Sequence, residues 1–225
     1  NYFMKYRPDI DGLRAVAVVS VIVYHAEFIF KGRWLLKGGF LGVDIFFVIS
    51  GFLITSIIYS ELKNDTFSFK QFYERRARRI LPILFFILLV SCATSYFLFT
   101  PSHFSSFAKS VISTILFYSN FNFYYSGQEY AAQSSHLKPL LHTWSLSIEE
   151  QFYFIFPPLL IFIHRLKKIK PIHILCLLSL ASLTLAHWAS TRHPQINFYL
   201  LPSRMWELLA GSILVFVPAP LAKIR

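Results

Sequence analysis

Long apolar runs alternate with short polar or basic segments along the whole chain, and this pattern predicts membrane-spanning helices. A helix needs roughly 20 predominantly apolar residues to cross a bilayer. Six runs meet this requirement, over residues 13–30, 39–62, 80–99, 144–164, 171–190 and 199–217. A seventh run, 107–125, is interrupted by Lys109, Asn120 and Asn122. The sequence therefore predicts an all-α, polytopic transmembrane helical bundle.

The behaviour of the interrupted run decides the orientation of every later segment. Cytoplasmic loops of membrane proteins carry an excess of Lys and Arg. If 107–125 does not cross, 15 Lys and Arg residues face the cytoplasm and 7 face outward, whereas crossing gives 12 and 10. We therefore expect a re-entrant or interfacial helix at 107–125, about six true spans and a cytoplasmic N-terminus.

Composition excludes a soluble domain, since 55% of the residues are hydrophobic and the mean hydropathy is +0.52. The net charge of +11 would also suit nucleic acid, but the basic residues lie in short loops between apolar runs, where they set topology. We expect no nucleic-acid partner and no metal site. One domain is expected over 4–217, with Met4 as a candidate start, 1–3 outside the native chain, and 218–225 as a cytoplasmic tail or truncated linker.

The first run carries two unusual residues, Arg14 and His25. Charged or titratable side chains inside a span are costly, and they therefore mark functional positions. Eleven residues of α-helix make about three turns, so the two side chains share one face about 16 Å apart along the axis. The first span therefore offers a cation near one membrane surface and an imidazole further along.

Polar residues of several spans are predicted to form one layer near the outer surface. At 1.5 Å per residue they lie roughly 8–12 Å below it. An imidazole beside carboxylates suits general-base or nucleophilic chemistry, whereas the alternative is a structural network that holds helices together. His25, Glu149, Glu150 and Asp44 are the catalytic candidates, and Arg204 and Glu207 are candidates for binding the substrate.

The opposite end of the first span faces a group of arginines. Arg75 and Arg78, and likewise Arg76 and Arg79, are three residues apart, which on a helix places two guanidinium groups together and suits phosphates. The alternative is a topology anchor or a lipid-headgroup contact. Together with Arg14, these residues predict a site for the phosphate-rich head of a long ligand whose reactive end reaches His25.

Aromatic residues offer a further candidate contact with the substrate. Trp144, Tyr153 and Trp206 could stack on sugar rings, as could aromatic residues within 121–130, although a membrane-interface belt is the alternative. Two rival functions use the same residues: a proton-coupled transporter with an intramembrane His and carboxylate relay, and a purely structural membrane subunit.

Five ordered segments together resemble one known family. They are "YRPDIDGLRAVAVVSVIVYHA", "GGFLGVDIFFVISGFLIT", "FYERRARRILP", "PLLHTWSLSIEEQFYFIFP" and "LPSRMWELLAGSIL". They resemble the bacterial acyltransferase family 3 of integral-membrane acyltransferases, from Tyr6 to about Leu214. The chain is shorter than the family's bundles, so we expect further C-terminal helices or an SGNH-type hydrolase-like domain as partners.

The resemblance implies an acyl-coenzyme A dependent O-acyltransferase of the bacterial inner membrane. The donor would be cytoplasmic acetyl-coenzyme A, and the acceptor a hydroxyl of an extracytoplasmic polysaccharide such as lipopolysaccharide O-antigen. The family's Arg-ten residues-His pattern maps onto Arg14 and His25. Its Arg-x-x-Arg pattern maps onto Arg75/Arg78 or Arg76/Arg79, and its glutamate onto Glu149 or Glu150.

Overall fold

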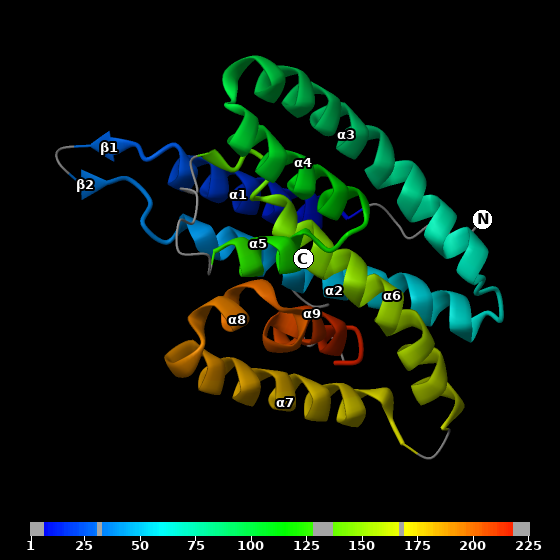
Figure 1. Cartoon of the computed structure of the whole chain (residues 1–225). Helices are drawn as coiled ribbons and strands as arrows, with labels where there is room; N and C mark the ends of the chain where they lie inside the picture. Colours follow the sequence, from blue (N-terminus) through cyan, green and yellow to red (C-terminus); the bar gives the residue numbers. More distant parts are fainter. Residues whose placement is uncertain (1–6, 31–32, 128–136, 167–168, 218–225) are drawn as a thin grey trace. The chain divides into compact units, whose positions relative to one another are not determined.

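The computed structural model describes residues 7–30, 33–127, 137–166 and 169–217, and these are almost entirely helical (Figure 1). Two short strands, β1 (Ile29–Phe30) and β2 (Arg33–Trp34), and a 3₁₀ turn, η1 (Gly39–Leu41), lie between the first two helices. The helices are α1 (Pro8–His25), α2 (Gly42–Lys63), α3 (Phe69–Leu98), α4 (Pro101–Ile115), α5 (Ser119–Ser126), α6 (Thr143–Arg165), α7 (Pro171–Arg192), α8 (Pro194–Tyr199) and α9 (Leu201–Leu214).

The all-α membrane bundle is confirmed, and within the part of the chain that the structure describes four helices are long and apolar enough to cross a bilayer. These are α2 together with η1, then α3, α6 and α7. Of the two other expected spans, α1 has 18 residues and includes Asp9, Asp11 and Arg14, and α9 has only 14 residues. The expected start at Met4, the tail 218–225 and part of the aromatic segment 121–130 lie outside the described residues.

The first helix begins and ends about five residues earlier than the apolar run 13–30 predicts. Pro8 suits the first helical turn, where its missing N–H is not needed, and Asp9 and Asp11 complement the positive end of the helix dipole. The helix ends at His25, and Glu27 adopts a positive φ of 51°. Apolar runs do not distinguish helix from strand, so the sequence could not place this end.

The arginine cluster lies on a helix rather than in a loop. Helix α3 has 30 residues, which is about 45 Å, and it begins at Phe69, so it exceeds the roughly 30 Å hydrocarbon core. Its first three turns therefore carry Arg75, Arg76, Arg78 and Arg79 at or beyond the end of the apolar part.

The structure divides into two compact units, which are described separately. The first contains Asn1–Ser60, Phe156–His187 and Pro202–Arg225, and the second contains Glu61–Ile155 and Trp188–Leu201. Helices α2, α6 and α7 each contribute to both.

In the second unit, the interrupted run 107–125 forms two short helices instead of a span. Helix α4 runs back beside α3, and the chain breaks at Phe117, whose φ is 53°, before α5 (Figure 1). Buried hydroxyls hold the break against α6: Ser119 and Ser147 Oγ atoms are 2.8 Å apart, and Thr114 and Thr143 Oγ1 atoms are 3.0 Å apart. Neither helix is long enough to cross alone, as the re-entrant or interfacial prediction requires.

In the first unit, α2 and α9 touch through two glycines. A Cβ on Gly51 would overlap the carbonyl oxygen of Leu208, and one on Gly211 would overlap that of Val48. Ser212 Oγ of α9 also donates to the Gly51 carbonyl of α2 at 3.4 Å. Small residues let helix backbones approach closely in this way, so the crossing fixes the relative position of the two helices.

We expect Gly51→Ala and Gly211→Ala each to lower the free energy of unfolding by at least about 2 kcal/mol, because the added methyl group meets backbone that cannot rotate away. Unfolding of the detergent-solubilised variants by SDS or heat measures this effect. Gly12→Ala is the control, since a Cβ there meets nothing within 4 Å. Stability equal to that of wild type in both α2 and α9 variants would show that the contact is not tight.

Candidate functional site

Arg14 and His25 lie on α1 as predicted, with His25 at its last residue and exposed. The His25 Nδ1 is 2.8 Å from the carbonyl oxygen of Val21. A carbonyl oxygen can only accept, so Nδ1 carries the hydrogen, and in the neutral ring Nε2 keeps its lone pair. The imidazole is thereby held in the tautomer that a general base or nucleophile requires.

Aromatic rings surround the end of α1. The Tyr24 ring forms edge-to-face pairs with the rings of His25, Trp34 and Phe40, with centroid distances of 5.2, 6.1 and 5.7 Å. Edge-to-face pairs of this kind stabilise a fixed arrangement. They hold the segment that follows α1 beside the exposed imidazole.

The prediction of a single polar layer is wrong for His25 and Asp44. Gly39 packs against Ser20 and Tyr24, and Gly42 packs against Ala17 and Val21, so α1 and the start of α2 run antiparallel. Asp44 is thus level with about Ala17. His25 lies eight residues further along α1, which is about 12 Å. Asp44 is therefore not the group that orients this imidazole.

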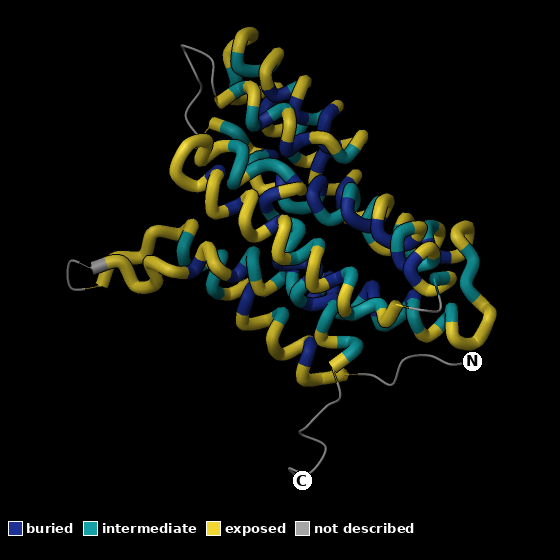
Figure 2. The backbone as a smooth tube through the Cα atoms, turned by 90° about the horizontal axis from the view of Figure 1, so that it is seen from below, coloured by how far each residue is buried: buried dark blue, intermediate teal, exposed yellow. Residues whose placement is uncertain are grey.

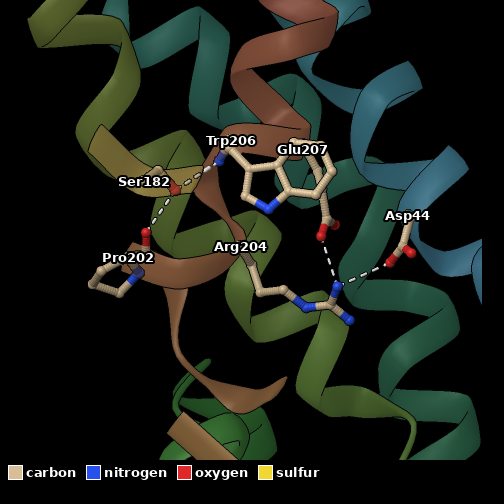
Figure 3. A network of polar contacts seen from close by, with 6 residues as sticks. All are labelled: Asp44, Ser182, Pro202, Arg204, Trp206 and Glu207. Carbon is tan, nitrogen blue, oxygen red and sulfur yellow. Dashed lines mark hydrogen bonds and ion pairs between the residues drawn. The ribbon is translucent and has the colours of Figure 1, made fainter. Parts of the chain in front are cut away.

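Asp44, Arg204 and Glu207 come together in the first unit, as predicted (Figure 3). Arg204 Nη1 donates to Asp44 Oδ1 at 3.0 Å and to Glu207 Oε1 at 2.6 Å. The Glu207 side chain is only 1% exposed, and its Oε2 has no hydrogen-bond partner among the described residues. One guanidinium thus joins α2 to α9 and compensates the charge of two carboxylates. This agrees with the alternative interpretation, in which these polar residues form a structural network that holds helices together.

A buried serine on α7 shapes the turn that carries Arg204. Ser182 Oγ donates to the Pro202 carbonyl at 2.6 Å and accepts from the Trp206 N–H at 2.9 Å (Figure 3). Those two backbone groups are the pair that an α-helix would join directly. The hydroxyl is therefore inserted into the ladder of α9, and such insertions widen a turn.

We expect Ser182→Ala to let this turn close and to shift Arg204. The rate of amide hydrogen exchange at Trp206 should then change, while the chain stays folded. Stability should fall by about 1 kcal/mol for the lost hydrogen bonds. Hydrogen exchange followed by mass spectrometry reads the first turn of α9. Thr184→Ala is the control, because Thr184 Oγ1 donates within α7 to the Ala181 carbonyl. Unchanged exchange in Ser182→Ala would contradict the insertion.

In the second unit, Glu150 pairs with an arginine rather than with the predicted layer. Arg76 Nη2 is 3.6 Å from Glu150 Oε1, and the Arg76 guanidinium lies 3.7 Å above the Tyr153 ring centroid. Arg76 and Glu150 are in contact, so they lie at one depth. Glu150 cannot then belong to an outer layer while Arg76 marks the cytoplasmic edge. The outer depth predicted for Glu150 and the cytoplasmic position predicted for Arg76 therefore cannot both be right.

Polar atoms of this pair keep hydrogen-bonding capacity. Arg76 Nε and Glu150 Oε1 are buried and have no hydrogen-bond partner among the described residues. The neighbouring Glu149 Oε2 accepts from the Tyr153 hydroxyl at 3.3 Å. An amide group of a ligand has both the acceptor that the Nε–H needs and the donor that the carboxylate oxygen needs.

The other arginines of α3 face outward. Arg75 pairs with Glu61 at 2.7 Å, Arg78 pairs with Glu74 at 2.7 Å, and Arg79 is exposed. Arg75 and Arg78 line a shallow surface hollow together with Gln71 and Glu74. Of the two predicted pairs, the structure thus places Arg75 and Arg78 on one face and separates Arg76 from them.

Trp144 is buried, which disfavours stacking on a sugar. It is 7% exposed, and Phe198 and Tyr199 cover it with ring centroids 4.4 and 5.9 Å away. It therefore packs in the second unit, which neither the sugar-binding nor the interface-belt interpretation predicts.

Sequence reasoning missed several residues that organise these sites. Ser182 was not singled out, and Tyr153 was a candidate for stacking on a sugar, whereas it is buried beneath the Arg76 guanidinium. Asn120, which is buried, and the partly buried Gln151 form an amide pair, with Gln151 Nε2 donating to Asn120 Oδ1 at 2.8 Å. The polar residues inside apolar runs were the available signal. Within the described ranges, no three His, Cys, Asp or Glu side chains come together to hold a metal ion.

Comparisons with known proteins agree on one family. A family model described as an acyltransferase domain matches residues 7–217. The O-acetyltransferase OatA of Staphylococcus aureus (strain NCTC 8325 / PS 47) is 37% identical over 226 residues, covering 98% of this chain and 36% of that protein. The peptidoglycan O-acetyltransferase OatA of Listeria monocytogenes serovar 1/2a is 40% identical over 223 residues, covering 96% of this chain and 35% of that protein.

The chain thus spans about a third of the length of these curated relatives. No solved structure matches it. The family model covers nearly all of the chain, and the motifs that carry Arg14, His25 and the α3 arginines fall within the matched range. The chain therefore belongs to acyltransferase family 3, the membrane acyltransferases that its motifs resemble.

Proposed function

We propose that the chain is the membrane part of a bacterial O-acetyltransferase. It takes an acetyl group from acetyl-coenzyme A on the cytoplasmic side and delivers it to a hydroxyl of an extracytoplasmic glycan. The observation that carries the proposal is α1 itself, which presents Arg14 and an exposed His25 with a free Nε2 on one helical face. O-acetyltransferase relatives over nearly the whole chain support the same reaction.

The orientation in this proposal places the N-terminus in the cytoplasm and the chain in the inner membrane as a multi-pass protein. Its support is the distribution of Lys and Arg, 15 against 7 when 107–125 does not cross. The short helices α4 and α5 agree with that assumption. His25 then faces outward, and the α3 arginines face the cytoplasm.

The donor's phosphates would bind on α3. Arg75 and Arg78 lie side by side in the shallow hollow, and their partners Glu61 and Glu74 are partly exposed. Exposed ion pairs contribute little, so phosphate can replace these carboxylates. Arg76, with its free Nε near Glu150, suits a polar group further along the donor's arm.

The chemistry needs one new C–O bond and one broken C–S bond. The acceptor hydroxyl attacks the thioester carbonyl, its proton passes to His25 Nε2, and the coenzyme thiolate leaves and takes up a proton. Alternatively, Nε2 attacks first and the acetyl group passes from the imidazole to the hydroxyl. Both routes use the tautomer that the Val21 carbonyl selects.

Peptidoglycan is the acceptor class that the comparisons favour. The Listeria relative is named a peptidoglycan O-acetyltransferase, whereas neither relative described here is named for lipopolysaccharide. We therefore place a cell-wall glycan ahead of the O-antigen that the resemblance suggested. Further helices or an SGNH-type domain remain partners within this proposal.

The test uses inverted membrane vesicles from cells that make the natural protein. Radiolabelled acetyl-coenzyme A is supplied on the cytoplasmic face, and label is followed into lumenal glycan. Label in the glycan supports transfer across the membrane. Proton-dependent solute uptake without any label transfer would instead support the transporter that uses the same His and carboxylates.

We expect the double variant Arg75→Ala/Arg78→Ala to raise the KM for acetyl-coenzyme A with a smaller change in kcat, because phosphate contacts far from the thioester act equally in ground and transition states. Initial rates at varied donor concentration measure this split. Arg192→Ala, at the last residue of α7, is the matched control. An unchanged KM in the double variant would contradict donor binding at this hollow.

A further inference from the structure

The segment that follows α1 exposes apolar side chains along most of its length. Eight large apolar side chains between positions 28 and 41 are 40–66% exposed, and the hairpin stands out as exposed in Figure 2. They are Phe28, Ile29, Phe30, Trp34, Leu35, Leu36, Phe40 and Leu41. A patch of this kind marks a surface that contacts something other than water.

This segment has a defined shape and is tied to α1. Strands β1 and β2 pair antiparallel with Ile29 opposite Trp34, and the Leu35 N–H donates to the Phe28 carbonyl at 2.9 Å. The Tyr24 ring meets both Trp34 and Phe40. The apolar hairpin is therefore fixed beside Tyr24, and His25 is the next residue along the chain.

The sequence of the segment identifies the chemistry of its partner. Positions 28–41 contain three basic residues, Lys31, Arg33 and Lys37, and no Asp, Glu, Asn, Gln, Ser or Thr. A sugar-binding surface needs side chains that accept hydrogen bonds from hydroxyls, and none is present. Aromatic and aliphatic side chains with interspersed Lys and Arg instead suit the membrane interface and anionic lipid headgroups.

Topology does not explain this positive charge. In the proposed orientation the hairpin lies on the outer side, where the positive-inside tendency disfavours Lys and Arg. A charge that works against that tendency requires its own function, and attraction to anionic headgroups provides one.

We propose that the hairpin of β1 and β2, with the segment that follows it to Leu41, inserts into the outer-leaflet interface, and that the basic residues in this stretch of the sequence bind anionic lipid headgroups. The hairpin holds the end of α1, and with it His25, at the headgroup level. The acetyl group is then delivered at the membrane surface rather than deep in the bilayer. The placement of His25 on the outer side rests on the proposed function, whereas the lipid contact itself does not.

The test measures lipid contact directly in the reconstituted chain. An environment-sensitive fluorophore is attached to Ile29→Cys, or to Leu35→Cys as a second site, in a Cys92→Ser/Cys176→Ser background. Nitroxide-labelled lipids quench from the bilayer, and iodide quenches from water. Thr66→Cys, in the exposed polar turn after α2, is the control for a label in water.

We expect lipid nitroxides to quench the hairpin label several-fold more than the Thr66 label, and iodide to show the reverse order. The charge-reversed variant Lys31→Glu/Arg33→Glu/Lys37→Glu should lose lipid quenching in vesicles that contain phosphatidylglycerol. A hairpin label reached by iodide, or protected from both quenchers by protein, would overturn the proposal. Equal quenching in the charge-reversed variant would overturn headgroup binding. Since no step requires acetyl transfer, these outcomes are separate from failure of the proposed function.

Discussion

Replacing His25 with alanine is expected to abolish acetyl transfer to glycan while donor binding remains. His25 is the exposed end of α1, and its Nδ1 hydrogen bond to Val21 leaves Nε2 free for the reacting hydroxyl or acetyl group. Loss of a general base reduces rates by about 10²–10⁴-fold, and loss of a nucleophile removes the route. Transfer of label from acetyl-coenzyme A in inverted vesicles measures the effect.

His173→Ala is the matched control, because His173 is an exposed histidine near the start of α7, in a different segment. It should transfer label at the wild-type rate. His25→Gln distinguishes the loss of the basic nitrogen from the loss of side-chain volume, since glutamine keeps a hydrogen-bonding side chain without a basic nitrogen. A His25→Ala protein that transfers label at the wild-type rate would exclude His25 from the chemistry. Label trapped on wild-type protein would favour the acetyl-histidine route.

Replacing Arg204 with methionine is expected to destabilise the first unit strongly. Arg204 Nη1 contacts both Asp44 and Glu207, and Glu207 is almost completely buried. Removing the guanidinium leaves a buried carboxylate without its counter-ion, which typically costs about 3–5 kcal/mol. The melting temperature of the protein in mild detergent should fall accordingly.

The double variant Arg204→Met/Glu207→Gln should recover much of the lost stability, because it removes the buried charge together with its partner. Arg78→Met is the matched control. Its partner Glu74 is also close, at 2.7 Å, but the Arg78 side chain is 80% exposed, so the change should be under about 1 kcal/mol. Similar losses for Arg204→Met and Arg78→Met would show that the buried cluster contributes no more than a surface pair.

Element ends were harder to predict than elements. The last apolar run, 199–217, was expected to be one span, but the chain breaks at Leu200 and α9 starts at Leu201. The first run was expected to continue to Phe30, and its last residues form a strand instead. Hydropathy is insensitive to both breaks, because apolar residues suit buried helix, strand and turn alike.

The sequence by itself determined the membrane bundle, the face shared by Arg14 and His25, and the family. These follow from local properties: the length of each apolar run, the helical repeat, and ordered motifs. The interruption of 107–125 by polar residues also indicated correctly that this run is not a simple span. The polar residues of this run include hydroxyls and amides that hold the chain break at Phe117 against α6.

Only the tertiary structure decided which charged residues meet. Asp44 and Arg204 are 160 residues apart, and two glycines of α2 and α9 set the approach of their helices. Glu150 pairs with Arg76 because α3 and α6 pack together, although the spacing of either residue from its span end predicted another depth. Depth counted along one helix ignores where neighbouring helices start and how closely they pack, and those are properties of the whole fold.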